Sequence, residues 1–144
     1  MRKKIVIVDD ERVGRYLIAK VLEKEGYNTV LASTGLGGLQ IVRDNPDVAL
    51  VITDVVMPDL DGRELATIIR SEKKRARLPI IIVSGLVALK EVSSIIELEH
   101  TRFLPKPIRT DDLLKYTEVL LQEHQQLSSS RLAANESDPR RAPS

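Results

Sequence analysis

Charged side chains follow short hydrophobic runs at several points along the chain. Asp54 closes the stretch Val48–Thr53, and Asp9 and Asp10 come directly after Ile5–Val8. Runs of this kind need burial on both faces, as the central strands of a parallel sheet do. Their terminal carboxylates therefore emerge at an edge of the sheet, where they can do chemistry, rather than on an ordinary solvated surface.

Two more polar side chains hold comparable positions. Ser84 follows the run Ile80–Val83, and Lys106 lies just beyond Thr101–Leu104. In an open parallel sheet, functional groups collect at the edge formed by the carboxyl ends of the strands, close to the point where the strand order reverses. We therefore expect the three carboxylates, the hydroxyl and the ammonium to face one crevice.

This set of groups suits phosphoryl transfer to a carboxylate. Three carboxylates brought close together repel one another unless a cation intervenes, and Mg²⁺ fits because it tolerates few carboxylates and keeps several waters. The metal and Lys106 would spread the charge on the phosphoryl oxygens, and Ser84 would donate a hydrogen bond. Asp54 would then attack in line.

Each of these residues also has an ordinary structural interpretation. Asp9 and Asp10 could simply favour the N-terminus of a helix, Lys106 could be a surface lysine, and Asp54 could begin a polar turn. Ser84 alone carries almost no information. Their joint placement at successive strand ends is what indicates a site.

Five strand-like runs alternate with five segments of helical periodicity, which predicts an α/β fold with a doubly wound parallel sheet. The strands are expected at 5–8, 28–32, 48–53, 80–83 and 101–104. The apolar residues that mark the five helices are Gly14, Leu17, Ile18, Val21 and Leu22; Leu36, Leu39 and Val42; Leu65, Ile68 and Ile69; Leu89, Val92, Ile95 and Ile96; and Leu113, Tyr116, Thr117 and Leu120. We expect one domain over residues 1–127 and a disordered tail or linker over 128–144, where periodicity is lost.

Composition excludes several classes of function. With 144 residues and a formal charge of +1, the chain is one domain with no excess charge, so nucleic acid is not expected as a direct partner. It has no cysteine, which removes disulfides and thiol chemistry. The run Ile5–Val8 is too short for an export signal, and no run approaches the roughly 20 apolar residues that span a membrane. We expect a cytoplasmic protein with no membrane contact.

The motifs at the strand ends resemble those of the response-regulator receiver domain of two-component signalling, in particular the stand-alone chemotaxis receivers. The resemblance covers roughly residues 3–125 and implies a flavodoxin-like strand order 2-1-3-4-5 with helices on both faces. The motifs that carry it are Val8-Asp9-Asp10, Asp54-Val-Val-Met-Pro-Asp-Leu-Asp-Gly62, Val83-Ser84-Gly85 and Leu104-Pro-Lys106-Pro.

The resemblance implies a role for each matching residue. Asp54 would be the phosphoacceptor, and Asp9, Asp10 and the Val56 carbonyl would complete the shell of the Mg²⁺ ion. The remaining roles would fall to Ser84 as the switch hydroxyl, Lys106 as the phosphate-contacting lysine, and Phe103 as the aromatic residue whose rotamer reports activation. The chain would be a signalling receiver, not a metabolic enzyme, although it would promote its own phosphorylation and slow dephosphorylation.

The same resemblance implies partners. A histidine kinase or histidine phosphotransfer protein would supply the phosphoryl group, docking near the first helix. Apart from the resemblance, the apolar run Leu86-Val87-Ala88-Leu89 indicates a surface where a downstream protein would bind the face made by the fourth helix, the fifth strand and the fifth helix. The protein would be a monomer or a phosphorylation-dependent homodimer, the latter supported by Leu113, Leu120, Leu121 and Leu127 of a last helix that runs to about Leu127.

The residues around the acceptor also indicate a long-lived phosphorylated form. Val56 and Leu86, which are expected to overlook the phosphoryl group, are both apolar. Neither can orient an attacking water, and each can exclude one.

Other functions compete with this hypothesis. A phosphohydrolase of the haloacid dehalogenase type also forms an aspartyl phosphate, but its Asp-x-Asp motif is replaced here by Asp9-Asp10-Glu11. A flavin-binding protein is disfavoured because the same loop carries acids where a phosphate cradle needs Ser, Thr and Gly. A receiver fold used as an unphosphorylated binding module, and the input half of a longer regulator, stay open.

Overall fold

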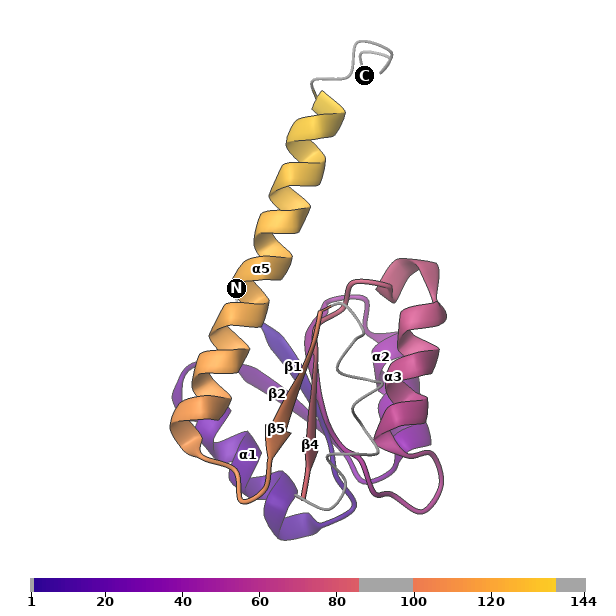
Figure 1. Cartoon of the computed structure of the whole chain (residues 1–144), viewed down its shortest axis with the longest axis vertical. Helices are drawn as coiled ribbons and strands as arrows, with labels where there is room; N and C mark the ends of the chain where they lie inside the picture. Colours follow the sequence, from indigo (N-terminus) through magenta and orange to yellow (C-terminus); the bar gives the residue numbers. More distant parts are fainter. Residues whose placement is uncertain (1, 86–99, 137–144) are drawn as a thin grey trace.

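The chain folds around a parallel five-stranded sheet with helices on both faces (Figure 1). The structure is a computed structural model that describes residues 2–85 and 100–136, with residues 127–136 described by their backbone only. The strands run in the order β2-β1-β3-β4-β5, which confirms the predicted topology. Their bounds are β1 Lys4–Val8, β2 Asn28–Ala32, β3 Val48–Asp54, β4 Ile80–Ser84 and β5 Thr101–Pro105.

Among the described residues, two pairs of helices cover the sheet. On one face lie α1 (Arg12–Lys24) and α5 (Thr110–Glu136), and on the other lie α2 (Gly35–Asp44) and α3 (Gly62–Ser71), as Figure 1 shows. A short 3₁₀ turn, η1 (Lys73–Arg75), follows α3. The predicted fourth helix, with Leu89, Val92, Ile95 and Ile96, lies outside the described residues, as does Leu86.

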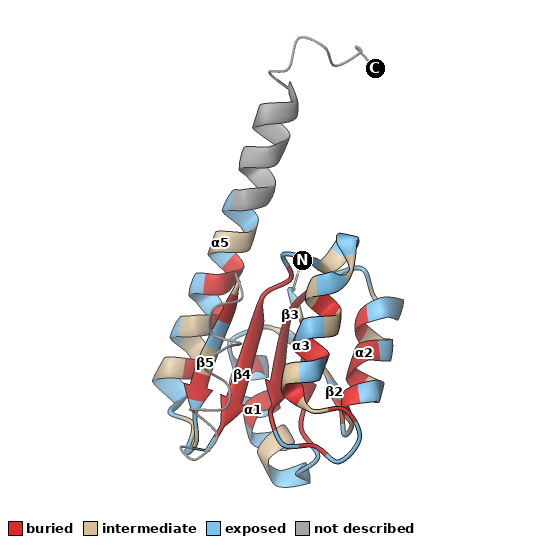
Figure 2. Ribbon diagram, turned by 45° about the vertical axis from the view of Figure 1, so that its right-hand side comes forward, coloured by how far each residue is buried: buried red, intermediate tan, exposed pale blue. Residues whose placement is uncertain are grey.

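Alternating side chains of β1 and β4 belong to two separate cores, one on each face of the sheet. In β1, Val6 and Val8 belong to the core under α2 and α3, whereas Ile5 and Ile7 belong to the core under α1 and α5. This division follows from the two-residue period of a strand. All seven residues of β3 are buried, so the strand that carries Asp54 lies inside the sheet along its whole length (Figure 2).

The end of α1 shows how a single glycine fixes the path into β2. Gly26 has a φ of +93°, and its N–H donates to the carbonyl of Glu23 at 2.9 Å. The N–H of Tyr27 donates to the carbonyl of Leu22 at 3.2 Å. This is a Schellman motif, in which glycine takes the left-handed position at no steric cost.

The structure differs from the helical pattern of the sequence in two respects. Leu17 and Leu36, which mark the first two helices in the sequence, are 57% and 59% exposed and so lie outside the core. The last helix does not end near Leu127 but continues to Glu136 and projects beyond the sheet (Figure 1), so the first part of the expected tail is helical. The predicted domain boundary at residue 127 therefore falls inside a helix, and residues 137–144 lie outside the described part of the chain.

The leucines expected to support a homodimer are used elsewhere. Leu113 and Leu120 are each 1% exposed and Leu121 is 8% exposed, all within the core under α1 and α5. They cannot form a dimer interface without unfolding that core. The side chain of Leu127 is outside the described part of the chain.

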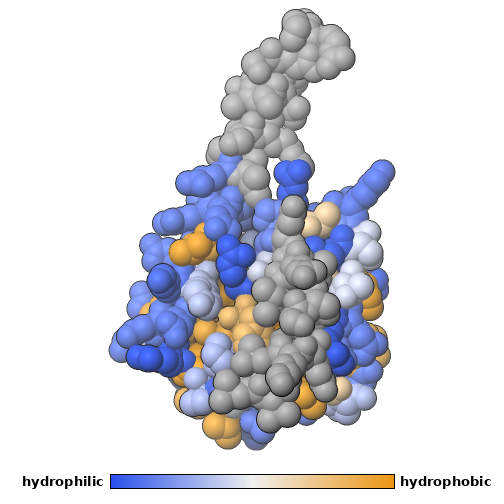
Figure 3. Space-filling model, in the orientation of Figure 1, coloured by the Kyte–Doolittle hydropathy of each residue, from blue (hydrophilic) through white to orange (hydrophobic). Residues whose placement is uncertain are grey.

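The exterior is mainly hydrophilic, with hydrophobic side chains exposed in several places (Figure 3). None of the helices within residues 2–85 and 100–136 combines the length and apolar character that crossing a bilayer requires.

We predict that Thr117→Val stabilises the protein. Thr117 is 0% exposed, and its hydroxyl finds no hydrogen-bond partner within the described residues. Because an unsatisfied buried hydroxyl costs about 1–3 kcal/mol and valine has nearly the same shape, the free energy of unfolding should rise by about 1 kcal/mol. Urea denaturation of both proteins measures the change.

Thr53→Val is the matched control, because Thr53 is also 0% exposed. Its hydroxyl, however, donates to the carbonyl of Asp54 at 2.9 Å. Loss of that bond should lower the free energy of unfolding by about 1 kcal/mol. If both substitutions lower stability equally, the Thr117 hydroxyl has a partner after all.

Candidate functional site

Asp54 lies at the carboxyl end of β3, with 8% of its surface exposed. It pairs in register with Val83 of β4, and the next N–H, of Val55, donates to the Val83 carbonyl at 3.2 Å. The backbone then folds back tightly, since a Cβ on Gly62 would collide with the Asp54 carbonyl. Asp54 is thus held by the sheet on one side and by the start of α3 on the other.

Lys106 joins Asp54 directly, as the sequence predicted. Its Nζ lies 2.8 Å from Asp54 Oδ2, and its backbone N–H donates to the carbonyl of Ser84 at 2.8 Å. The backbone bond continues the β4–β5 pairing past the end of the strand and so sets where the side chain starts. Burial alone would lower the pKa of Lys106, but the hydrogen bond to Asp54 and the charges of Asp54 and Asp9 outweigh it and raise the pKa above its usual value. The ammonium therefore stays charged at neutral pH.

Asp9 and Asp10 complete the acidic cluster. Each of Asp9, Asp10 and Asp54 offers one carboxylate oxygen, and these oxygens all lie within 4.8 Å of one another. Asp9 is 3% exposed, whereas Asp10 is exposed. Burial and, to a smaller degree, the charge of Asp54 raise the pKa of Asp9, although the N–H of Glu11 and the charge of Lys106 oppose the shift. The predicted convergence of these strand ends is confirmed.

The first turn of α1 fixes Asp9 in a way that the sequence did not reveal. In the sequence, Gly14 only marks the first helix, but a Cβ there would lie 2.9 Å from Asp9 Oδ2. Arg15 donates from its Nη1 to the Asp9 carbonyl at 2.7 Å. Glycine therefore gives the carboxylate room, and the arginine holds the backbone. Neither contact leaves a pattern in the sequence, because both depend on how closely the helix approaches the strand.

Of the other predicted site residues, Ser84 and Val56 lie at this edge of the sheet, and Phe103 is in the middle of β5. Ser84 ends β4 and is 1% exposed. Val56 follows Asp54 in the β3–α3 loop, with its side chain 70% exposed. Phe103 of β5 is half-buried and packs against the core under α2 and α3. A switching hydroxyl, a metal-binding carbonyl and a rotating ring remain predictions for these three.

The acidic cluster fits a hard divalent cation. Its donors are all carboxylate oxygens, and the buried Asp9 is held at a raised pKa by its surroundings. Lys106 contributes one positive charge against the three carboxylates. A cation with oxygen ligands would relieve the remaining repulsion, and Mg²⁺ suits a site with few protein ligands and room for water.

The sequence matches the family described as the response regulator receiver domain over residues 5–118. The chain belongs to this family. Within it, the receiver domain is 30% identical over 118 residues to two-component response regulator ORR7 of Oryza sativa subsp. japonica, covering 82% of this chain and 56% of that protein. It is 36% identical over 119 residues to response regulator MprA of Mycobacterium leprae, covering 82% and 50%.

Solved structures agree with this assignment. The receiver domain is similar to a response regulator receiver domain protein from Clostridium thermocellum, with a TM-score of 0.79 and 28% identity over 87% of this chain and 98% of that one. A receiver protein from Pseudomonas putida gives a TM-score of 0.76 and 30% identity over 82% and 97%. Chemotaxis protein CheY4 of Vibrio cholerae, at 23% identity and a TM-score of 0.76 over 83% and 99%, shares the fold.

The chain corresponds to only part of each of the two relatives named first. The chain spans little more than half of the rice protein and half of the mycobacterial one. It is a receiver domain of the kind found in two-component signalling, with the acidic cluster that the sequence predicted.

We predict that Asp9→Asn stabilises the metal-free protein at neutral pH. The folded protein raises the pKa of Asp9, so it binds the Asp9 proton more tightly than the unfolded chain does. The favourable contribution is complete below the unfolded pKa and is lost as pH rises through the raised folded pKa. Asparagine keeps the oxygen that accepts from the Glu11 N–H at 2.9 Å and removes the charge. With a chelator present, the gain in unfolding free energy should be larger at pH 7 than at pH 4.

Mg²⁺ provides the second half of this test. The ion should raise the melting temperature of the unaltered protein and raise that of Asp9→Asn much less, because a charged ligand is lost. Asp47→Asn is the control: Asp47 is an exposed carboxylate whose pKa is lowered by its hydrogen bond to Lys4, and its loss should leave the Mg²⁺ effect intact. Equal Mg²⁺ effects in all three proteins would contradict a metal site at Asp9.

Proposed function

We propose that this receiver domain accepts a phosphoryl group on Asp54 from a phosphohistidine of a kinase or phosphotransfer protein, with Mg²⁺ bound by Asp9, Asp10 and Asp54. The observation that carries the proposal is the Lys106 ammonium 2.8 Å from Asp54 Oδ2 inside a cluster of carboxylate oxygens within 4.8 Å of one another. This arrangement supports Asp54 as the nucleophile, the Lys106 ammonium as its positive partner, and the three carboxylates as metal ligands.

The chain's own groups would act in sequence. An oxygen of Asp54 attacks phosphorus in line while the bond from phosphorus to the donor nitrogen breaks. The Lys106 ammonium transfers its hydrogen bond from Asp54 to a phosphoryl oxygen, where it stabilises negative charge, and Ser84 donates to another. The three carboxylates and the Val56 carbonyl would hold Mg²⁺, which would supply further charge neutralisation. The near-complete burial of Asp54 limits water around the reacting atoms.

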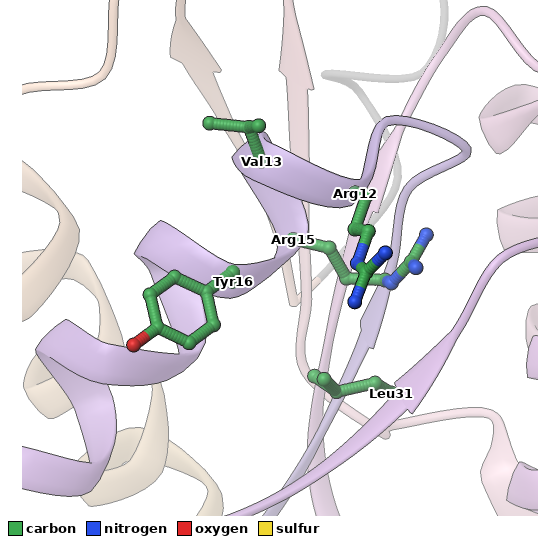
Figure 4. Close-up of a pocket in the computed structure, with 5 residues that line it drawn as sticks. All are labelled: Arg12, Val13, Arg15, Tyr16 and Leu31. Atoms are coloured by element: carbon green, nitrogen blue, oxygen red, sulfur yellow. The ribbon is translucent and has the colours of Figure 1, made fainter.

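The face of α1 nearest the site is suited to the donor. Val13, Tyr16 and Leu17 are 69%, 54% and 57% exposed, a concentration of apolar side chains on one helix. Beside them lies a groove of about 280 Å³ between α1 and β2, lined by Arg12, Val13, Arg15, Tyr16 and Leu31 (Figure 4). Exposed apolar surface of this kind marks protein-binding faces, and α1 begins directly after Asp10 and Glu11, so a donor helix docked there would present its phosphohistidine to Asp54.

The proposal also includes a downstream partner. A downstream protein would bind β5 and α5 together with the segment between β4 and β5. Ser84 as the switch hydroxyl and Phe103 as the rotating ring would couple this face to phosphorylation. The proposed location is the cytoplasm, and the oligomeric state is a monomer unless residues other than the buried leucines of α5 provide an interface.

Incubation with acetyl phosphate and Mg²⁺ tests the central step. We expect the mass of one phosphoryl group to be added, and peptide mapping to locate it on Asp54. Asp54→Asn should remain unmodified, and chelation of Mg²⁺ should prevent the reaction. Asp61→Asn, which alters a half-buried carboxylate that caps α3, should be modified normally.

The same experiment separates the competing functions. A phosphohydrolase would turn over phosphate monoesters repeatedly instead of retaining one phosphoryl group. An unphosphorylated binding module would gain no mass under any of these conditions, and that result would refute the proposal.

We predict that the phosphorylated protein is long-lived and that Val56→Asn shortens its lifetime several-fold. Val56 is 70% exposed beside Asp54 and offers no group that can orient a water. An amide there can hold and align one. Loss of the phosphoryl group after removal of the donor, followed by mass spectrometry over time, measures the rate.

Val119→Asn is the control for this comparison, because Val119 is an apolar residue, 37% exposed, on α5. It should leave the rate unchanged. An unchanged rate in Val56→Asn as well would mean that Val56 does not govern access of water.

A further inference from the structure

Asp59 makes a contact that neither phosphoryl transfer nor metal binding accounts for. From the loop between β3 and α3 it reaches the N-terminus of α2, where Oδ1 accepts from the N–H of Gly35 at 3.1 Å. Its Oδ2 accepts from the N–H of Leu36 at 2.9 Å. One carboxylate therefore bonds two consecutive backbone amides of a helix that is more than twenty residues away in sequence.

The electrostatics favour this contact. Hydrogen bonds from the backbone, that of Leu36 first, lower the pKa of Asp59, so the carboxylate is charged at neutral pH. A negative group at the first turn of a helix also interacts favourably with the helix dipole. The contact is thus a charge-assisted pair of bonds rather than a chance approach of a surface side chain.

The backbone of α2 also packs closely against the loop at Leu60, next to Asp59. A Cβ on Gly35 would collide with the carbonyl of Leu60, so only glycine lets α2 approach the loop so closely. α2 has a separate cap of its own: the Thr34 hydroxyl accepts from the N–H of Gly37 at 2.9 Å. Asp59 and Thr34 therefore serve different amides, and the bonds of Asp59 connect the helix to the loop.

The loop that contains Asp59 begins directly after Asp54 of the site. It leaves Asp54 and includes Val56, whose side chain is exposed. At its base, the N–H of Gly62 donates to the Val55 carbonyl at 2.9 Å. The bond between Gly62 and Val55 therefore closes the two ends of the loop. Asp59, near the middle of the loop, connects it to α2.

We propose that Asp59 is a positioning residue, which by bonding Gly35 and Leu36 fixes the Val55–Leu60 loop against α2 and thereby holds the Val56 backbone in place for the metal. The inference deepens the proposed function and rests on it for the identity of the ion. It assigns no contact between Asp59 and the ion or the phosphoryl group. Asp59 acts through the loop, as residues that orient metal ligands do.

Asp59→Ala, Asp59→Asn and the control Thr34→Ala test the inference. Thr34→Ala removes a cap from the same helix but leaves the loop bonds intact. We measure the Mg²⁺ dissociation constant by calorimetry without any phosphoryl donor, and backbone hydrogen exchange of the loop. In Asp59→Ala the dissociation constant should rise about tenfold and the loop amides should exchange faster. Asp59→Asn, which keeps one acceptor oxygen, should fall between, and Thr34→Ala should leave both loop exchange and Mg²⁺ affinity close to the unaltered values.

Several results would overturn the inference. One is unchanged loop exchange in Asp59→Ala; another is an unchanged Mg²⁺ affinity there. A third is a Thr34→Ala variant that matches Asp59→Ala, because the effect would then be loss of helix capping. If the unaltered protein binds no Mg²⁺, the metal site of the proposed function is refuted, and hydrogen exchange alone decides whether Asp59 fixes the loop.

Discussion

The ion pair between Lys106 and Asp54 is the interaction on which the site depends. Asp9 and Asp54 are 3% and 8% exposed, and with Asp10 they bring three carboxylates within 4.8 Å. Buried like charges destabilise a fold unless cations are placed among them. The single ammonium offsets only part of this repulsion. The protein is therefore folded in a state that favours uptake of a cation, and a transferred phosphoryl group would give the ammonium a second partner.

The sheet order makes this arrangement possible. β1 and β3 are neighbours, so Asp9, Asp10 and Asp54 meet without any long side chain. β5 is separated from β3 by β4, so only a long flexible residue can reach across, and lysine has that length. Two cores, one on each face of the sheet, hold these strand ends in register. Burial of each large aliphatic side chain contributes about 1.5–3 kcal/mol, which offsets the cost of collecting charges at one edge.

Sequence reasoning recovered the strands and the residues that gather at their ends, because β-branched runs and terminal charges are local signals. It did not show that Leu17 and Leu36 are exposed, since apolar spacing identifies a helix but does not say which apolar side chains meet the sheet. It ended α5 too early, because the Ser- and Ala-rich residues after Leu127 lack apolar periodicity but still extend a helix that is already nucleated. The contacts of Gly14 and Asp59 were missed because they depend on distances between elements.

The glycines of α2 illustrate that last point in energetic terms. Each glycine in a helix costs up to about 1 kcal/mol relative to alanine, which by itself predicts a weak helix. In the structure, however, a Cβ on Gly38 would lie 2.6 Å from Val8 Cγ2, and one on Gly35 would meet the Leu60 carbonyl. The helix thus gives up intrinsic propensity in exchange for close contact with β1 and with the β3–α3 loop. Val8 of β1 directly precedes Asp9, and the β3–α3 loop begins directly after Asp54. The packing of α2 against these two neighbours therefore helps to set the geometry of the site.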